Sequence, residues 1–185
     1  MKGDETKTNS NPIFDSIVTN SIVWKNKSGY YAGIGGGASF LYGMNDPIPV
    51  IDLKFGVYSF FNPYIGVRGY ASFDYGYSRW HSRSMAFMLS LGLDVIIEAP
   101  ISKKHYVYAG FIGAFGLQGY LVYNQVAHKT FSDLEKSGAI IAQVGLTTSI
   151  SKQSRISAIY RFFPNRKITQ FKPTGFVILE YSFKF

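Results

Sequence analysis

Residues 84–98 read SMAFMLSLGLDVIIE, and every odd position from Met85 to Ile97 holds a large apolar side chain. The even positions include Ser90, Asp94 and Glu98. Alternation with a period of two indicates a β-strand, because successive side chains of a strand point to opposite faces. Strands of soluble proteins are typically about five or six residues long. The greater length of this stretch predicts a strand that crosses a bilayer at a tilt.

The same alternation recurs along the rest of the chain. Seven further segments show it, at 29–44, 49–60, 64–77, 105–123, 138–150, 155–163 and 175–185. Three connections are short, at 61–63, 99–104 and 151–154, and three are mostly longer, at 78–83, 124–137 and 164–174. The first connection, 43–48, is short but lies at the same end of the predicted barrel as the longer ones. An even strand number with short periplasmic turns is typical of outer-membrane barrels. We therefore predict an all-β fold, an eight-stranded antiparallel transmembrane β-barrel over residues 29–185, in the bacterial outer membrane with both termini in the periplasm.

Charged residues occupy only the less apolar face of the predicted strands. They are Asp52, Lys54, Arg68, Asp74, Asp94, Glu98, Arg155, Arg161, Glu180 and Lys184. Strands can satisfy all of their backbone hydrogen bonds in hydrocarbon only by closing into a barrel. The apolar face then meets lipid, and the charged face lines a lumen that is narrow enough for side chains to fill when there are eight strands. We predict that these charges of both signs pair with one another there.

Residues 1–28 form a polar N-terminal tail in this interpretation. We expect a disordered periplasmic extension. The alternative is a short amphipathic helix, because Ile13, Phe14, Ile17 and Val18 recur at helical spacing after Asn11-Pro12. The chain has no cysteine, which excludes a disulfide framework, a thiolate nucleophile and a cysteine-based zinc site.

Two resemblances follow from particular residues. The end of the chain, Tyr181-Ser182-Phe183-Lys184-Phe185, resembles the C-terminal signature of outer-membrane barrels. That resemblance implies that Tyr181, Phe183 and Phe185 address the chain to the barrel-assembly machinery. Residues 66–77 (GVRGYASFDYGY), residues 105–113 (HYVYAGFIG) and the last strand resemble the barrel region of the Helicobacter-type outer-membrane protein family. The family includes porins and adhesins, but the sequence does not contain the large extracellular domain of the adhesins, so the resemblance does not imply adhesion.

Two patterns could suggest a cofactor or catalysis. Residues 33–38 (GIGGGA) match a dinucleotide-binding motif, with Asp52 near the expected spacing, but the motif needs a following helix and Pro47 comes soon after. We expect strand glycines and no cofactor. Residues 80–84 (WHSRS) combine histidine with serine, as a lipid-A-modifying barrel enzyme would need. They match no enzyme signature, and His81, His105 and His128 are too dispersed to predict a metal site.

The formal net charge is +8, and the basic residues are divided between the two ends of the predicted barrel. Six lie in the predicted external loops, namely Arg79, Arg83, Lys129, Arg166, Lys167 and Lys172. Lipopolysaccharide phosphates are natural partners for such side chains, although a solvated rim is the alternative. Lys25, Lys27, Lys103, Lys104 and Lys152 lie at the other end. Nucleic-acid binding would require one basic face, which this division does not provide, so we expect no nucleic-acid partner.

The sequence as a whole therefore predicts a monomeric barrel that contacts outer-membrane lipid and lipopolysaccharide. We expect a structural or surface-interaction role, a lumen largely filled by side chains, and no enzymatic turnover. A narrow channel for small solutes is the first alternative, and a lipid-A-modifying enzyme is the second.

Overall fold

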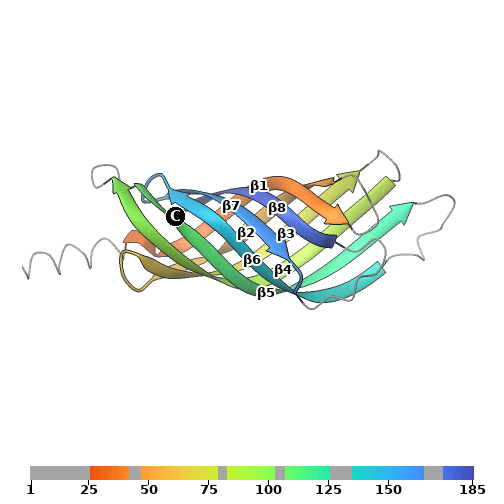
Figure 1. Cartoon of the computed structure of the whole chain (residues 1–185), viewed down its shortest axis with the longest axis horizontal. Helices are drawn as coiled ribbons and strands as arrows, with labels where there is room; N and C mark the ends of the chain where they lie inside the picture. The colour runs from red at the N-terminus through yellow and green to blue at the C-terminus, as the bar shows by residue number, and fades with distance from the viewer. Residues whose placement is uncertain (1–25, 42–46, 79–82, 103–106, 126–134, 165–172) are drawn as a thin grey trace, which may run out of the picture.

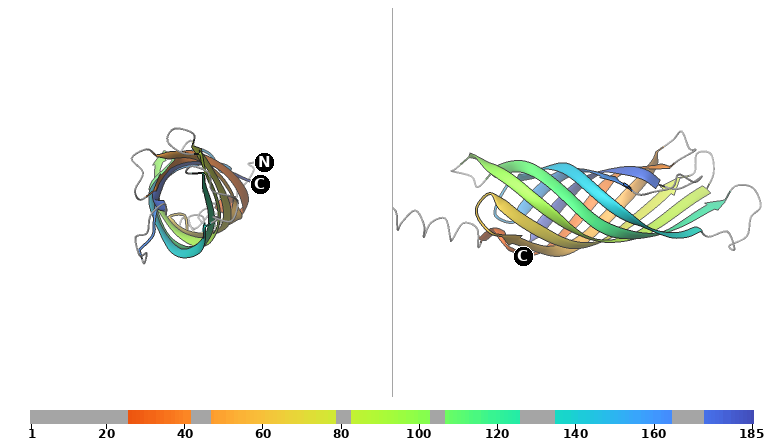
Figure 2. Two further views of the ribbon diagram at one scale, coloured as in Figure 1. Left: turned by 90° about the vertical axis from the view of Figure 1, so that its right-hand side faces the viewer. Right: turned by 60° about the horizontal axis from the view of Figure 1, so that its bottom comes forward.

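The protein is an eight-stranded antiparallel barrel closed on itself (Figure 1). A computed structural model describes residues 26–41, 47–78, 83–102, 107–125, 135–164 and 173–185. The strands are β1 (Gly29–Leu41), β2 (Ile48–Phe60), β3 (Ile65–Ser78), β4 (Arg83–Ser102), β5 (Val107–Gln125), β6 (Glu135–Ser149), β7 (Ser154–Phe162) and β8 (Pro173–Lys184). Each strand pairs with the next, and β8 pairs with β1. The end-on view in Figure 2 shows the strands enclosing the axis. The predicted fold class is confirmed, whereas the stretch from Ile13 to Val18 lies outside the described residues.

The largest difference from the predicted strand limits is at the end of β4. Residues 99–104 are a turn in the sequence-based prediction, but β4 continues to Ser102 and pairs with β5 past a register shift between Pro100 and Ser102. The amide of Glu98 donates to the carbonyl of Tyr64, on the β3 side, at 2.8 Å. The nitrogen of Pro100 lies two residues further on, on that same side. Because β3 begins only at Ile65, the missing N–H of the proline interrupts no ladder bond.

Side-chain caps explain the two short turns at the same end of the barrel. In the turn between β2 and β3, the Asn62 carboxamide oxygen accepts the amides of Tyr64 and Ile65, both at 2.8 Å. In the turn between β6 and β7, the Ser151 hydroxyl accepts the amides of Gln153 at 3.2 Å and Ser154 at 3.0 Å. Asn and Ser favour turns because they replace backbone partners in this way.

The outer face of the barrel is apolar. Leu93 on β4 is 67% exposed and Phe115 on β5 is 72% exposed, and similarly exposed aliphatic and aromatic side chains occur on the other strands. A continuous apolar surface of this kind is untenable in water and suits a bilayer. Among the described residues, no helix is long and apolar enough to span a membrane.

Glycines on the inner face make room for aromatic rings. Gly92 lies directly opposite Tyr70 in the β3–β4 pair, and Gly66 lies opposite Phe60 in the β2–β3 pair. A Cβ added at Gly92 would lie 2.5 Å from the Tyr70 hydroxyl oxygen, and one added at Gly66 would lie 2.7 Å from a ring carbon of Phe60. Each ring therefore covers a glycine on the neighbouring strand, which places bulky groups inside a narrow barrel.

Candidate functional site in the barrel lumen

The barrel interior holds nine of the ten charged residues that the sequence places on the inner face. Asp52, Lys54, Arg68, Asp74, Asp94, Glu98, Arg155, Arg161 and Glu180 are all buried. The tenth, Lys184, lies at the end of β8 and is half-buried. Its ammonium donates to the carbonyl oxygens of Asn26 and Ser28, so it fastens the segment before β1 to the last strand.

The central part of the lumen contains a layer of ion pairs that links five strands. Arg68 donates through Nε to Asp94 at 2.5 Å and through Nη1 to Glu180 at 2.6 Å. The other oxygen of Glu180 accepts the Lys54 ammonium. Arg161 donates through Nη1 to Asp74 at 2.5 Å. Buried charges are tolerated only when they are paired in this manner, because leaving water is costly for each of them.

A second group of charges closes the end of the lumen where the short turns lie. Glu98 accepts the Lys27 ammonium at 2.6 Å and Nη1 of Arg155 at 2.8 Å. Lys27 also donates to the carbonyl of Pro63 at 2.5 Å, and its nitrogen lies 3.2 Å from the centre of the Tyr108 ring. Burial lowers the pKa of Lys27 below its usual 10.5, and the hydrogen bond that its ammonium donates to Glu98 opposes that shift. The sequence-based interpretation left Lys27 in the tail, so its contact with Glu98 was missed.

Two apolar clusters inside the lumen were also missed. One lies towards the loop end of the strands and contains Val50, Ala86, Met88, Tyr120, Phe176 and Ile178. The other lies towards the turn end and contains Tyr31, Tyr58, Phe60, Tyr70, Ile96 and Ile112. All of these residues are on the same strand faces as the charges. The even positions of β4 could have predicted the clusters, because Met88 and Ile96 lie on the same face as Asp94. The charged layer therefore lies between two apolar ones.

Tyrosines join the turn-end cluster to the charged layer. The rings of Tyr31 and Tyr58 lie 4.4 Å apart, and the guanidinium carbon of Arg68 lies 5.4 Å from the centre of the Tyr31 ring. The Tyr58 hydroxyl shares a hydrogen bond of 3.0 Å with Ser182, and the Tyr70 hydroxyl accepts the side-chain amide of Gln143. These rings fill the lumen on the turn side of Arg68 and attract its guanidinium through cation–π contacts.

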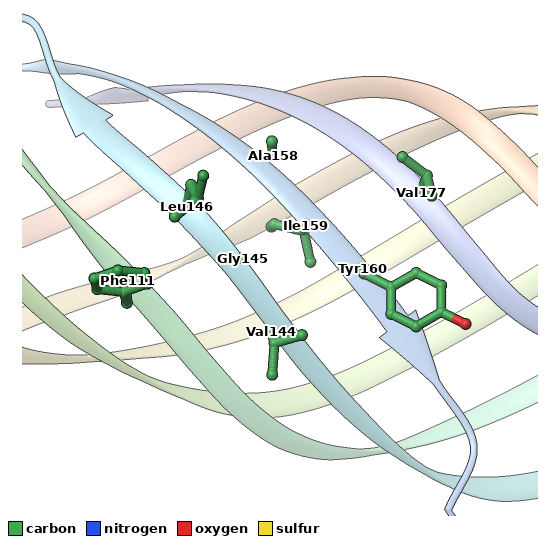
Figure 3. A pocket seen from close by; sticks show the side chains of 8 residues that line it. All are labelled: Phe111, Val144, Gly145, Leu146, Ala158, Ile159, Tyr160 and Val177. Atoms are coloured by element: carbon green, nitrogen blue, oxygen red, sulfur yellow. The ribbon is translucent and has the colours of Figure 1, made fainter.

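The outer face carries a shallow groove of about 410 Å³ across β5 to β8 (Figure 3). Its walls are apolar and include Phe111, Val144, Leu146 and Val177, with Ala158 as a small residue between them. The hydroxyl of Tyr160 is the polar side-chain group in the lining. The groove belongs to the membrane-facing surface, and its lining offers no acid, base and nucleophile set.

Several residues that the sequence singles out cannot be placed. Arg79, Lys129, Arg166, Lys167 and Lys172 lie outside the described residues, as do all three histidines. Arg83 begins β4, but its side chain is not described. The lipopolysaccharide and enzyme hypotheses therefore stay predictions. Residues 33–38 lie inside β1, where their glycines are part of a strand.

The proposed assembly residues lie on the outer face at the end of the chain. Tyr181, Phe183 and Phe185 are all exposed there. The amide of Phe185 donates to the carbonyl of Tyr30 at 3.0 Å, so the terminus is held against the first strand. Their role in assembly stays a prediction.

Comparison with known proteins gives one family and several similar folds. The family described as "Helicobacter outer membrane protein" matches residues 52–185. No curated protein matches the sequence significantly. Neisserial surface protein A is 10% identical with a TM-score of 0.57, and the alignment covers 86% of this chain and 97% of that one. Ail of Yersinia pestis is 16% identical with a TM-score of 0.51, covering 85% and 97%. The outer membrane enzyme PagL is 12% identical with a TM-score of 0.58, covering 84% and 99%. At these identities the likeness is one of fold.

Proposed function

We propose, because this chain belongs to the Helicobacter outer membrane protein family, that it is a non-conducting structural barrel of the outer membrane that presents its longer loops at the cell surface. The barrel architecture and the family place it in that membrane. The structural role, the closed lumen and the direction of insertion are the parts that we propose.

The accessibility of the lumen carries the proposal. Lys54, Arg68, Asp74, Arg161 and Glu180 each have 0% exposed surface although they face the barrel axis. A continuous column of water along that axis would leave side chains of this layer accessible. The apolar cluster at the loop end includes the fully buried Phe176, which obstructs the path further. These observations support a scaffold rather than a diffusion pore.

The direction of insertion rests on the connections. The turns around Asn62 and Ser151 are short and capped by their own side chains, and they lie at the same end as the C-terminus. Short turns lie in the periplasm in barrels of this class. We therefore place both termini there. An epitope inserted after Lys152, in the short turn between β6 and β7, leaves Phe185 at the C-terminus and should stay inaccessible to antibody on intact cells, and labelling of intact cells would reverse the orientation.

Conductance across a planar bilayer tests the closed lumen. The purified, refolded protein should insert without producing steady conductance steps. The double variant Met88→Ala/Phe176→Ala, which trims the loop-end cluster, serves as a sensitivity control and should show more current fluctuation than the wild-type chain. Stable conductance steps from the wild-type protein would favour the narrow channel and would defeat the proposal.

Lipopolysaccharide is the partner that we propose for the basic loop residues. Arginine and lysine pair strongly with phosphate groups. Replacing Arg166 and Lys167 together by glutamine should weaken binding to lipopolysaccharide vesicles, whereas replacing Lys152 in the turn between β6 and β7 should not. The same preparations can be checked for altered lipid A by mass spectrometry with His81→Ala as control. A mass change that depends on His81 would support the enzyme alternative instead.

A further inference from the structure

Asp52 is a buried carboxylate for which the charged layer provides no hydrogen bond. Its side chain has 0% exposed surface, and neither of its oxygens has a hydrogen-bond partner among the described residues. The nearest cations are Nζ of Lys54 and Nη2 of Arg161, each 3.8 Å away. Both of these groups make their close contacts elsewhere, Lys54 with Glu180 and Arg161 with Asp74. An ionised carboxylate in this position would be poorly compensated.

Asp52 also faces a second carboxylate. It lies directly opposite Asp74 in the register of β2 and β3, and both side chains point into the lumen. Directly opposite side chains on antiparallel strands have Cβ atoms about 5 Å apart. One oxygen of Asp74 accepts from Arg161 and the other, Oδ1, has no partner among the described residues. Two buried carboxylates at this spacing cannot both stay ionised without a strong penalty.

The charges of the central layer do not balance. It contains four carboxylates (Asp52, Asp74, Asp94 and Glu180) and three cations (Lys54, Arg68 and Arg161). The surplus cation of the lumen, Lys27, is at the turn end with Arg155 and Glu98, and the turn-end cluster lies between that group and Asp52. The imbalance of one negative charge is therefore local to the layer that contains the facing pair.

We propose that Asp52 and Asp74 together hold one proton, carried on Asp52 and donated to Oδ1 of Asp74. The proton is taken up from water as the barrel closes, so no bond other than the new O–H is formed or broken. It leaves the layer with three negative and three positive groups, and it gives both Asp52 and Asp74 Oδ1 a hydrogen-bond partner. A metal cation would need space between Lys54 and Arg161, which repel it, whereas a proton needs none.

The side-chain amide of Gln118 lies beside the same pair. It is buried, its nitrogen donates to Asp74 Oδ2 at 3.4 Å, and its oxygen has no partner among the described residues. Asp74 thus receives Arg161 and Gln118 on Oδ2 and the proton of Asp52 on Oδ1. This arrangement makes Asp74 the ionised member and Asp52 the neutral member of the pair. The inference rests on the closed lumen of the proposed function.

Infrared spectroscopy of the folded barrel in detergent at neutral pH tests the shared proton. The wild-type spectrum should contain the C=O stretch of one protonated aspartic acid, identified by its shift after ¹³C labelling of aspartate. Asp52→Asn should remove that band, and Asp74→Asn should remove it too, because Asp52 then ionises as the partner of Arg161. Glu98→Gln is the matched control and should keep it, because Glu98 pairs with Lys27 and Arg155 outside the layer and its loss leaves the facing pair and the four carboxylates and three cations unchanged.

The stability of Asp52→Asn, compared with that of Asp94→Asn, gives an independent measurement. Asp52→Asn replaces a neutral group by a neutral group of the same shape, so its midpoint of denaturant unfolding should match that of the wild type. Asp94→Asn should lower the midpoint, because Arg68 loses an ionised partner. A wild-type spectrum without the band, or an Asp52→Asn midpoint as low as that of Asp94→Asn, would overturn the proposal. Neither result would bear on conductance, so the two proposals fail separately.

Discussion

Replacing Arg68 by methionine removes the cation that Asp94 and Glu180 share while keeping most of the side-chain volume. Glu180 keeps Lys54 as a partner, but Asp94 loses Arg68, the cation with which it makes its closest contact. The guanidinium also lies 5.4, 5.8 and 5.9 Å from the ring centres of Tyr31, Tyr58 and Tyr70. The substitution therefore leaves a buried carboxylate unpaired and removes cation–π contacts at the same time.

The expected magnitude follows from the burial of these groups. Two opposite charges about 4 Å apart attract by roughly 4 kcal/mol at the effective dielectric constant of about 20 that suits protein sites. Arg68 makes two such contacts and is fully buried, so its own desolvation cost offsets part of the gain. Removing one partner of a buried pair typically costs about 3–5 kcal/mol. We expect Arg68→Met to lower the free energy of unfolding by about that amount.

Urea unfolding of the refolded barrel in detergent, followed by circular dichroism, measures this loss. Arg68→Lys should cost less, since it keeps the charge but can no longer contact Asp94 and Glu180 through separate nitrogens. The double variant Arg68→Met/Asp94→Asn should recover part of the loss, because it no longer leaves that carboxylate unpaired. If Arg68→Met stays within about 1 kcal/mol of the wild type, the range of exposed ion pairs, the lumen is hydrated and the reasoning fails.

Three further substitutions test other parts of the fold. Gly92→Ala should destabilise the barrel by about 1–3 kcal/mol, because the new methyl group would overlap the ring of Tyr70. Leu91→Arg on the membrane-facing side of β4 should cost about 2–4 kcal/mol in lipid vesicles, as a charge near the bilayer midplane does. Lys27 binds its proton less readily in the folded barrel than in the unfolded chain, so stability should rise as the pH increases through the lowered pKa towards 10.5, and Lys27→Met should flatten that rise.

Matched controls make these outcomes specific. Gly113→Ala adds the same methyl group on the outer face, where it would meet nothing within 4 Å, and should be neutral or slightly stabilising. Equal losses for Gly92→Ala and Gly113→Ala would contradict the ring contact. Leu91→Ala should cost less than Leu91→Arg, and the reverse order would argue that this face is not in lipid. If the stability of Lys27→Met depends on pH in the same way as that of the wild type, Lys27 is not buried at the turn end of the lumen.

The local pattern of the sequence predicts the strands and their faces well. Each strand repeats its side-chain direction every two residues, so the odd positions around Leu91 and Leu93 and the even positions around Asp94 separate without any knowledge of the neighbouring strands. The ends are less well determined, as the extension of β4 to Ser102 shows, because pairing with β5 continues after the alternation of residues 84–98 has ended.

The even positions of β4 also hold apolar residues, and the sequence-based prediction considered only the polar and charged residues on that face. Met88 and Ile96 share the inner face with Asp94, and they mark the two apolar layers of the lumen. Lys27 could not be placed from the sequence, since it precedes the first strand and contacts Glu98 on β4, a strand that is not a neighbour of β1, across the turn end of the closed barrel.

What the sequence determines by itself is which side chains face inward and that the strands number eight, since both follow from a periodicity of two that is local to each strand. The partners across the lumen depend on the stagger between strands and on the closure of β8 against β1. Those long-range features pair Arg68 with Glu180, 112 residues away, and leave Asp52 facing Asp74 without a close cation. Only the closed barrel decides these contacts, because no local pattern records how far one strand has slid along the next.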